Sequence, residues 1–170
     1  MIDPIRLEVI RNALVAASEE MNISIWRTAR STVVRETLDY STAVFDAEGQ
    51  AVAKSTRIPV HLNSMSVCLA EILANWLPLD DWAEGDVVLT NDPYAGGQHL
   101  PDFVAFKPIY GDGPNGRVRV GIAGAIVHHV DVGGGAPGRN YARAQEKNQE
   151  GQRLAPQKLV EGGRRKAAGL

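Results

Sequence analysis

Two apolar segments joined by a glycine-containing turn constrain the fold of this chain more than any other feature. Residues 103–109 and 117–127 have the composition of strands, and residues 111–116 between them are typical of a tight turn. A second, shorter hairpin is predicted over residues 43–53, where Gly49 supplies the positive φ that its turn needs. The chain is therefore expected to contain a sheet built around these two hairpins.

Two amphipathic helices accompany these strands. Residues 3 to about 27 place apolar side chains at three- and four-residue spacing, and the Asp3-Pro4 start is typical of a helix cap. A second helix is predicted over residues 64–76. Strands are predicted from Thr32 onward and over residues 86–89. These elements predict an α+β fold, with a mixed or antiparallel sheet flanked by helices.

The composition indicates one ordinary globular domain. The chain has 170 residues, of which 44% are hydrophobic and 22% charged, and its net charge of -2 provides no basic face for nucleic acid. Its one cysteine, Cys68, is expected to be a buried apolar residue, and the lack of a disulfide framework suits the cytoplasm. No apolar run approaches the roughly 18 residues of a membrane span, and the start does not resemble a signal peptide. We therefore expect a soluble cytoplasmic protein without membrane contact.

The last thirty residues differ from the rest. Residues 139–153 are polar, and residues 162–166 are basic. We expect residues 1–138 to form the domain, and residues 139–170 to be loosely ordered or ordered only by contact with another chain.

Two polar loops, each directly after a predicted strand, contain the residues best suited to chemistry. They hold His99 and Asp102 in one loop and His128, His129 and Asp131 in the other. Imidazole and carboxylate together suit Zn²⁺, Mn²⁺ or Fe²⁺, with positions left open for water and substrate. Because neighbouring side chains on a strand face opposite ways, one of His128 and His129 is expected to be a ligand, and spacing alone does not choose between them. Ordinary turn or hydrogen-bonding roles are the alternative.

Several motifs resemble those of the hydantoinase B family. That family includes N-methylhydantoinase and 5-oxoprolinase subunits and the large subunits of acetone and acetophenone carboxylases. The resemblance covers residues 1 to about 138 and is carried by Asp3–Asn12, Arg27–Ser31, Asp39–Asp46, Ile58–Leu62, Asn91–Asp102 and His128–Gly134.

The resemblance implies a divalent metal ion held by His99, Asp102 and His128. Asp39 resembles a further ligand or a close neighbour of the ligands.

The same resemblance implies roles near the metal for three other residues. His129 and Asp131 are expected to be catalytic, and His61 to lie beside the ligands or on the substrate side. Alanine at His61 is expected to weaken metal binding much less than alanine at His99, because His61 lies outside both loops.

The resemblance also implies an ATP-dependent reaction shared between subunits. A hydantoinase A-type partner subunit would use ATP to phosphorylate a lactam, amide or enolate oxygen, and this chain has no Walker-type phosphate loop of its own. The expected function is that of a metal-binding subunit of a cyclic-amide hydrolase, working in an oligomer on a small cyclic amide. One alternative is a ketone carboxylase subunit. Because family members are much longer, another is an inactive truncated remnant or assembly module, and whether the chain alone is an enzyme stays open.

Overall fold

The computed structural model describes residues 3–55, 58–135, 145–146 and 149–166 of the chain. Its helices and strands follow one another in this order: α1 Pro4–Thr28, α2 Thr32–Glu36, β1 Tyr40–Phe45, β2 Ala51–Lys54, α3 Pro59–Asn75, η1 Leu79–Asp81, β3 Val87–Thr90, η2 Pro93–Ala95, β4 Asp102–Gly113, β5 Gly116–His128, β6 Gln157–Glu161 and β7 Arg164–Arg165.

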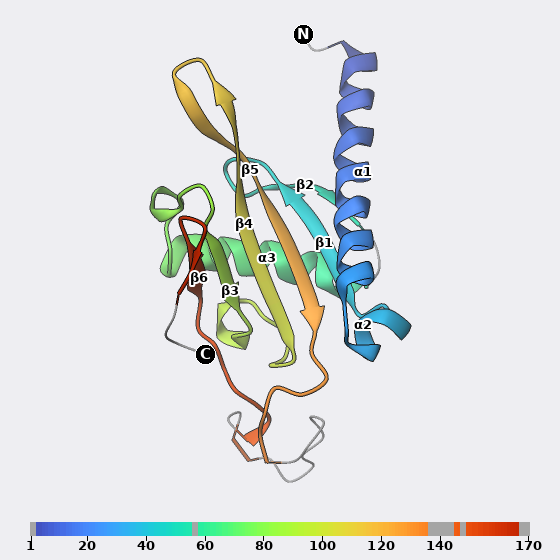
Figure 1. The fold of residues 1–170 in the computed structure, drawn as a ribbon, viewed down its shortest axis with the longest axis vertical. Coiled ribbons are helices and arrows are strands. Elements are labelled where there is room, and N and C mark those ends of the chain that lie inside the picture. Colours follow the sequence, from blue (N-terminus) through green and yellow to red (C-terminus); the bar gives the residue numbers. More distant parts are fainter. Residues whose placement is uncertain (1–2, 56–57, 136–144, 147–148, 167–170) are drawn as a thin grey trace.

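The strands form one antiparallel sheet. Its order is β2-β1-β5-β4-β3-β6-β7, and every neighbouring pair is antiparallel (Figure 1). The predicted α+β class and both predicted hairpins are confirmed, and the sheet is antiparallel rather than mixed. The long β4–β5 hairpin lies at its centre and connects the two halves.

Two boundaries differ from those predicted. Residues 32–36 form the short helix α2 instead of a strand, and β1 begins only at Tyr40. The β-branched residues of this stretch favour strands, but the chain has to turn between α1 and β1. The second predicted helix begins at Pro59 rather than Ser64, because proline is well tolerated in the first helical turn.

Helix α3 packs on one face of the sheet and forms the hydrophobic core with it. The core consists of Ala43, Phe45, Met65, Cys68, Leu69, Ile72, Trp82, Val88, Val104, Phe106, Ile122 and Ile126. Phe45 and Phe106 meet edge to face, with ring centroids 5.9 Å apart, an arrangement that aromatic rings favour. Burial raises the pKa of the Cys68 thiol to about 12, so this cysteine is an unreactive packing residue, as predicted.

Helix α1 lies on the opposite face of β1, and its contact with the sheet is polar. Ala43 faces the core beside α3, so alternation directs Thr42 to the other face. Thr42 donates a hydrogen bond to the Ser18 carbonyl at 2.7 Å, and Ser18 and Asn22 are the buried residues of α1. The predicted apolar stripe of this helix is only partly covered: Leu7 is 56% exposed and Ile10 54%, whereas Leu14, Met21 and Ile25 are half-buried. The first turns of α1 extend beyond β1 and β2 (Figure 1).

The described part of the segment after residue 139 contributes two strands, β6 and β7, to the sheet. Residues 136–144, 147–148 and 167–170 lie outside the described residues, but β6 pairs with β3, and Leu154 is buried. Strand β6 was not predicted because it is only five residues long and has few apolar side chains, those of Leu159 and Val160. The division of the chain at residue 138 stays a prediction. No helix of the described residues is long and apolar enough to cross a membrane.

A buried carboxylate fastens the β6–β7 hairpin to the rest of the sheet. Asp86 accepts hydrogen bonds from the Gly162 amide at 2.7 Å and the Ala83 amide at 2.8 Å, and it lies 2.9 Å from the Lys158 ammonium. Burial would raise the pKa of Asp86, but these hydrogen bonds and the Lys158 charge outweigh it and hold the pKa below its usual value.

We predict that Asp86→Asn lowers the free energy of unfolding by about 2 kcal/mol near pH 7, because a buried amide cannot replace these charge-assisted bonds. Since the folded-state pKa lies below the unfolded one, the stabilisation is present above about pH 4 and is lost as the pH falls through the folded-state pKa. Urea unfolding near neutral pH and near pH 3 measures this difference. Asp80→Asn, at an exposed carboxylate, is the control and should change little. A stability loss of equal size at both pH values would contradict the prediction.

Candidate metal site

The register of the central hairpin brings two of the predicted site residues together. Asp102 is the first residue of β4 and His128 the last residue of β5, and their Cα atoms are partners across the two strands. The His129 amide donates to the Pro101 carbonyl at 2.8 Å, which continues the pairing beyond the strands. The two side chains therefore lie side by side at one end of the sheet, where β4 begins and β5 ends (Figure 1).

The loop before β4 is held by a buried asparagine. The Asn91 side-chain amide donates to the carbonyls of Leu100 at 2.7 Å and Gln152 at 2.8 Å, while its oxygen accepts from the Leu154 amide at 2.6 Å. These bonds tie the loop that carries His99 to the segment leading into β6. No local sequence pattern predicts this role, because Asn91 resembles an ordinary loop residue.

Asp39 reaches the site through a sharp change of backbone direction. Leu38, between α2 and β1, has a φ of 56°, a left-handed conformation that is uncommon for a leucine. The Asp39 carbonyl then accepts a hydrogen bond from the His128 amide at 3.1 Å, which fixes Asp39 beside the end of β5. Such a conformation persists only where the surrounding structure enforces it, and here it directs a carboxylate toward His128.

A fifth side chain, His61, enters from the first turn of α3. Its ring is only 3% exposed, and its Nε2 lies 3.6 Å from Asp39 Oδ1 and 3.7 Å from Asp102 Oδ2. His61 thus lies beside both carboxylates although it is outside both loops, and the predicted effect of alanine at His61 on metal binding stays a prediction. A proline-initiated helix at Pro59 was the available signal, since it would have placed His61 in a helical turn rather than in an irregular stretch.

Asp102 is the centre of this cluster. Its Oδ1 is hydrogen-bonded to His128 Nδ1 at 2.8 Å, and its Oδ2 lies 3.5 Å from His99 Nε2. That second oxygen is buried and has no hydrogen-bond partner among the described residues. One ligand atom from each of His99, Asp102 and His128 lies within 4.8 Å of the others. The structure thus brings these three together with Asp39, whose Oδ2 is 3.6 Å from His128 Nδ1.

Burial favours the neutral form of the His61 imidazole. Burial lowers the pKa of its imidazole, and this effect outweighs the carboxylates of Asp102 and Asp39, which favour the protonated form, while His99 and His128 oppose it. A neutral imidazole has a lone pair available for a cation.

The two residues expected to be catalytic, His129 and Asp131, make their contacts outside the cluster around Asp102. The His129 ring packs against Phe103, with centroids 4.6 Å apart, and burial together with neighbouring His128 lowers its pKa. Asp131 is exposed and accepts a hydrogen bond from the Gly133 amide at 2.9 Å, as turn residues do. Within the described residues no hydrogen bond or ion pair joins either side chain to the cluster. Their catalytic roles stay predictions, and alternation along the strand accounts for the outward direction of His129.

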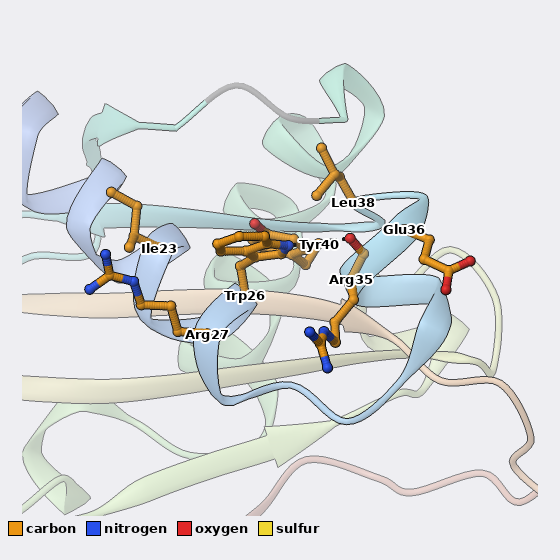
Figure 2. Close-up of a pocket in the computed structure, with 7 residues that line it drawn as sticks. All are labelled: Ile23, Trp26, Arg27, Arg35, Glu36, Leu38 and Tyr40. Atoms are coloured by element: carbon orange, nitrogen blue, oxygen red, sulfur yellow. Dashed lines mark hydrogen bonds between the residues drawn. The ribbon is translucent and has the colours of Figure 1, made fainter.

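A separate hollow lies between α1, α2 and the start of β1. It has a volume of about 570 Å³ and is lined by Ile23, Trp26, Arg27, Arg35, Glu36, Leu38 and Tyr40 (Figure 2). The Trp26 indole donates to the Arg35 carbonyl at 3.2 Å, so its polar atom is already engaged. Tyr40 and Asp39 are neighbours and point to opposite faces, which separates this hollow from the carboxylate cluster.

The chain belongs to the hydantoinase B/oxoprolinase family, whose sequence pattern matches residues 3–170. It is 36% identical over 165 residues to a 5-oxoprolinase of Dictyostelium discoideum, covering 95% of this chain and 12% of that protein. It is 35% identical over 168 residues to the caprolactamase beta subunit of Pseudomonas jessenii, covering 97% of this chain and 27% of that subunit. The chain thus spans well under a third of the length of these relatives.

Solved structures agree with this assignment. The ATP-dependent caprolactamase of Pseudomonas jessenii superimposes with a TM-score of 0.85 at 34% identity, over 97% of this chain and 28% of that chain. A nucleotide-free acetone carboxylase superimposes with a TM-score of 0.84 over 96% of this chain and 21% of that one. The acetone carboxylase is 21% identical, so it shows a shared fold.

Proposed function

We propose that this chain supplies the metal site of an ATP-dependent cyclic-amide hydrolase of the hydantoinase and 5-oxoprolinase type, working with a hydantoinase A-type subunit. The observation that carries the proposal is the buried Asp102 Oδ2, which lacks a hydrogen-bond partner and faces the His99 imidazole. A buried carboxylate oxygen without a partner costs free energy, and a cation at this position would remove that cost.

The donor set suits a divalent transition metal. His99, Asp102 and His128 would hold the ion, with Asp39 as a further ligand or close neighbour. The three offer nitrogen and oxygen atoms and no sulfur, which fits Zn²⁺, Mn²⁺ or Fe²⁺. When bound, such an ion polarises a carbonyl or phosphoryl oxygen or lowers the pKa of a bound water molecule.

The surrounding residues fix the shape of the site. The His128–Asp102 hydrogen bond sets the orientation of that imidazole, and the pairing of β4 with β5 holds both side chains in place. His99 is half exposed, with a side-chain exposure of 50%, so the site is open on the side of its loop. A small substrate would approach from that side.

A hydrolase is favoured over a ketone carboxylase. The caprolactamase is 34% identical over 97% of this chain. The acetone carboxylase is only 21% identical and supports the fold alone. The cyclic amide is thus the proposed substrate class, with ATP used by the partner subunit. The exposed apolar residues of α1, such as Ile5 and Val9, are the kind of surface that another chain covers.

We predict that the purified chain binds about one divalent metal ion, and that His99→Ala and Asp102→Ala abolish binding because each removes a ligand. His129→Ala is the matched control, since this neighbouring histidine packs on Phe103 and should leave metal content unchanged. Elemental analysis after dialysis against Zn²⁺, Mn²⁺ or Fe²⁺ measures the occupancy. Full occupancy in His99→Ala would show that the ligand assignment is wrong.

We also predict that the isolated chain does not hydrolyse hydantoin or 5-oxoproline, with or without ATP. It has no phosphate-binding loop, and an open site cannot exclude water or orient a substrate without further walls. An ATP-coupled assay on monodisperse protein tests this, with the His99→Ala variant alongside. ATP-dependent turnover that disappears in that variant would contradict the prediction, because it would place a complete active site within this chain.

A further inference from the structure

We propose that His61 is a direct ligand of the metal and that Ser41 holds its ring in the tautomer that binding requires. This inference rests on the proposed metal site and adds a donor from α3, an element that the two histidine-containing loops do not include. His61 is buried at the start of that helix and directs Nε2 into the space between the Asp39 and Asp102 carboxylates.

The distances around His61 and His99 suit a shared cation better than direct hydrogen bonds, whereas His128 Nδ1 is hydrogen-bonded directly to Asp102 Oδ1 at 2.8 Å. His61 Nε2 lies 3.6 Å from Asp39 Oδ1 and 3.7 Å from Asp102 Oδ2, and His99 Nε2 lies 3.5 Å from the same Asp102 oxygen. Hydrogen bonds between such atoms are shorter than about 3.2 Å. Ligand atoms around a tetrahedral ion with bonds near 2.1 Å are separated by about 3.4 Å, which is close to the separations found here.

The unpartnered oxygen points to the same place. Asp102 Oδ2 is buried without a hydrogen-bond partner, and it is the oxygen that both His61 and His99 approach. If His61 were only a packing residue, its buried Nε2 would be expected to pair with one of the two carboxylates. An ion between these atoms would satisfy the oxygen and both imidazoles together.

Ser41 contacts the other ring nitrogen of His61, and in the proposed arrangement it accepts the hydrogen bond from that nitrogen. Ser41 Oγ lies 3.3 Å from His61 Nδ1 and also accepts a hydrogen bond from the Ile58 amide at 3.3 Å. Asp39 directly precedes β1 and Ser41 is the second residue of that strand, and both side chains contact His61 of α3. When Nδ1 carries the proton, its N–H group donates a hydrogen bond to Ser41 Oγ, and Nε2 keeps its lone pair for the metal. Ser41 is therefore a positioning residue, of the kind that orients metal-ligating histidines.

The first test observes the His61 ring in the wild-type chain. The chain has four histidines, so long-range ¹H–¹⁵N spectra of protein labelled at histidine are assignable with single His→Gln variants. Zn²⁺ is the probe because it is diamagnetic. We expect Zn²⁺ to shift His61 Nε2 to the position of a metal-bound nitrogen and to leave the proton on Nδ1.

The second test measures Zn²⁺ affinity in variants by competition with a chelator. His61→Ala should weaken binding by about 100-fold, and Ser41→Ala by about 10-fold, because the ring remains but loses its orientation. Ser55→Ala is the matched control. Its hydroxyl is also buried, but it pairs with Thr42 Oγ1 at 3.0 Å on the face of β1 that carries α1, so affinity should not change.

The outcomes separate this inference from the proposed function. Zn²⁺ binding by the wild-type chain without any change at the His61 nitrogens would overturn the inference and leave the metal site in place. A His61→Ala variant that binds Zn²⁺ as tightly as the wild type would also overturn the inference and leave the metal site in place. A Ser41→Ala variant that matches Ser55→Ala in affinity would overturn the role of Ser41. A wild-type chain that binds no Zn²⁺, Mn²⁺ or Fe²⁺ would overturn both proposals, and the spectra of the wild type decide the matter even if a variant does not fold.

Discussion

The site depends on a carboxylate that is buried at the end of a central strand and has a hydrogen-bond partner for only one of its two oxygens. Asp102 pairs one oxygen with His128 and leaves the other facing His99 and His61. A buried carboxylate in this state is unfavourable in itself, so the surrounding fold has to enforce it. Hydrophobic burial in the core beneath α3 is the source of free energy that can offset this cost.

Four separate parts of the chain converge on Asp102, and each is fixed by an interaction outside the site. The register of β4 and β5 places His128 opposite Asp102. The left-handed conformation of Leu38 directs Asp39 toward the site, and His61 reaches it from α3. Asn91 fastens the loop of His99 to the segment that leads into β6. This arrangement follows a common principle, in which polar groups of a site are held by a rigid scaffold whose stability comes from elsewhere.

Much of the fold can be predicted from the sequence because the signals for the hairpins and the first helix lie close together along the chain. Their turns, caps and periodicity lie within a few residues of each other, and so does the His99–Asp102 pair. The participation of His61 and the support from Asn91 depend on contacts between distant segments, which periodicity cannot report. Strand β6 was missed for a similar reason, because it needs few apolar residues once β3 offers a free edge.

The coordination shell of the bound metal tests this account most directly. X-ray absorption spectroscopy on the Zn²⁺-loaded chain reports the type and number of atoms around the ion. We expect nitrogen and oxygen ligands at about 2.0–2.2 Å, with the outer-shell scattering of more than one imidazole and no sulfur. A shell without imidazole scattering, or one containing sulfur at about 2.3 Å, would contradict the central claim that the cluster around Asp102 holds the metal.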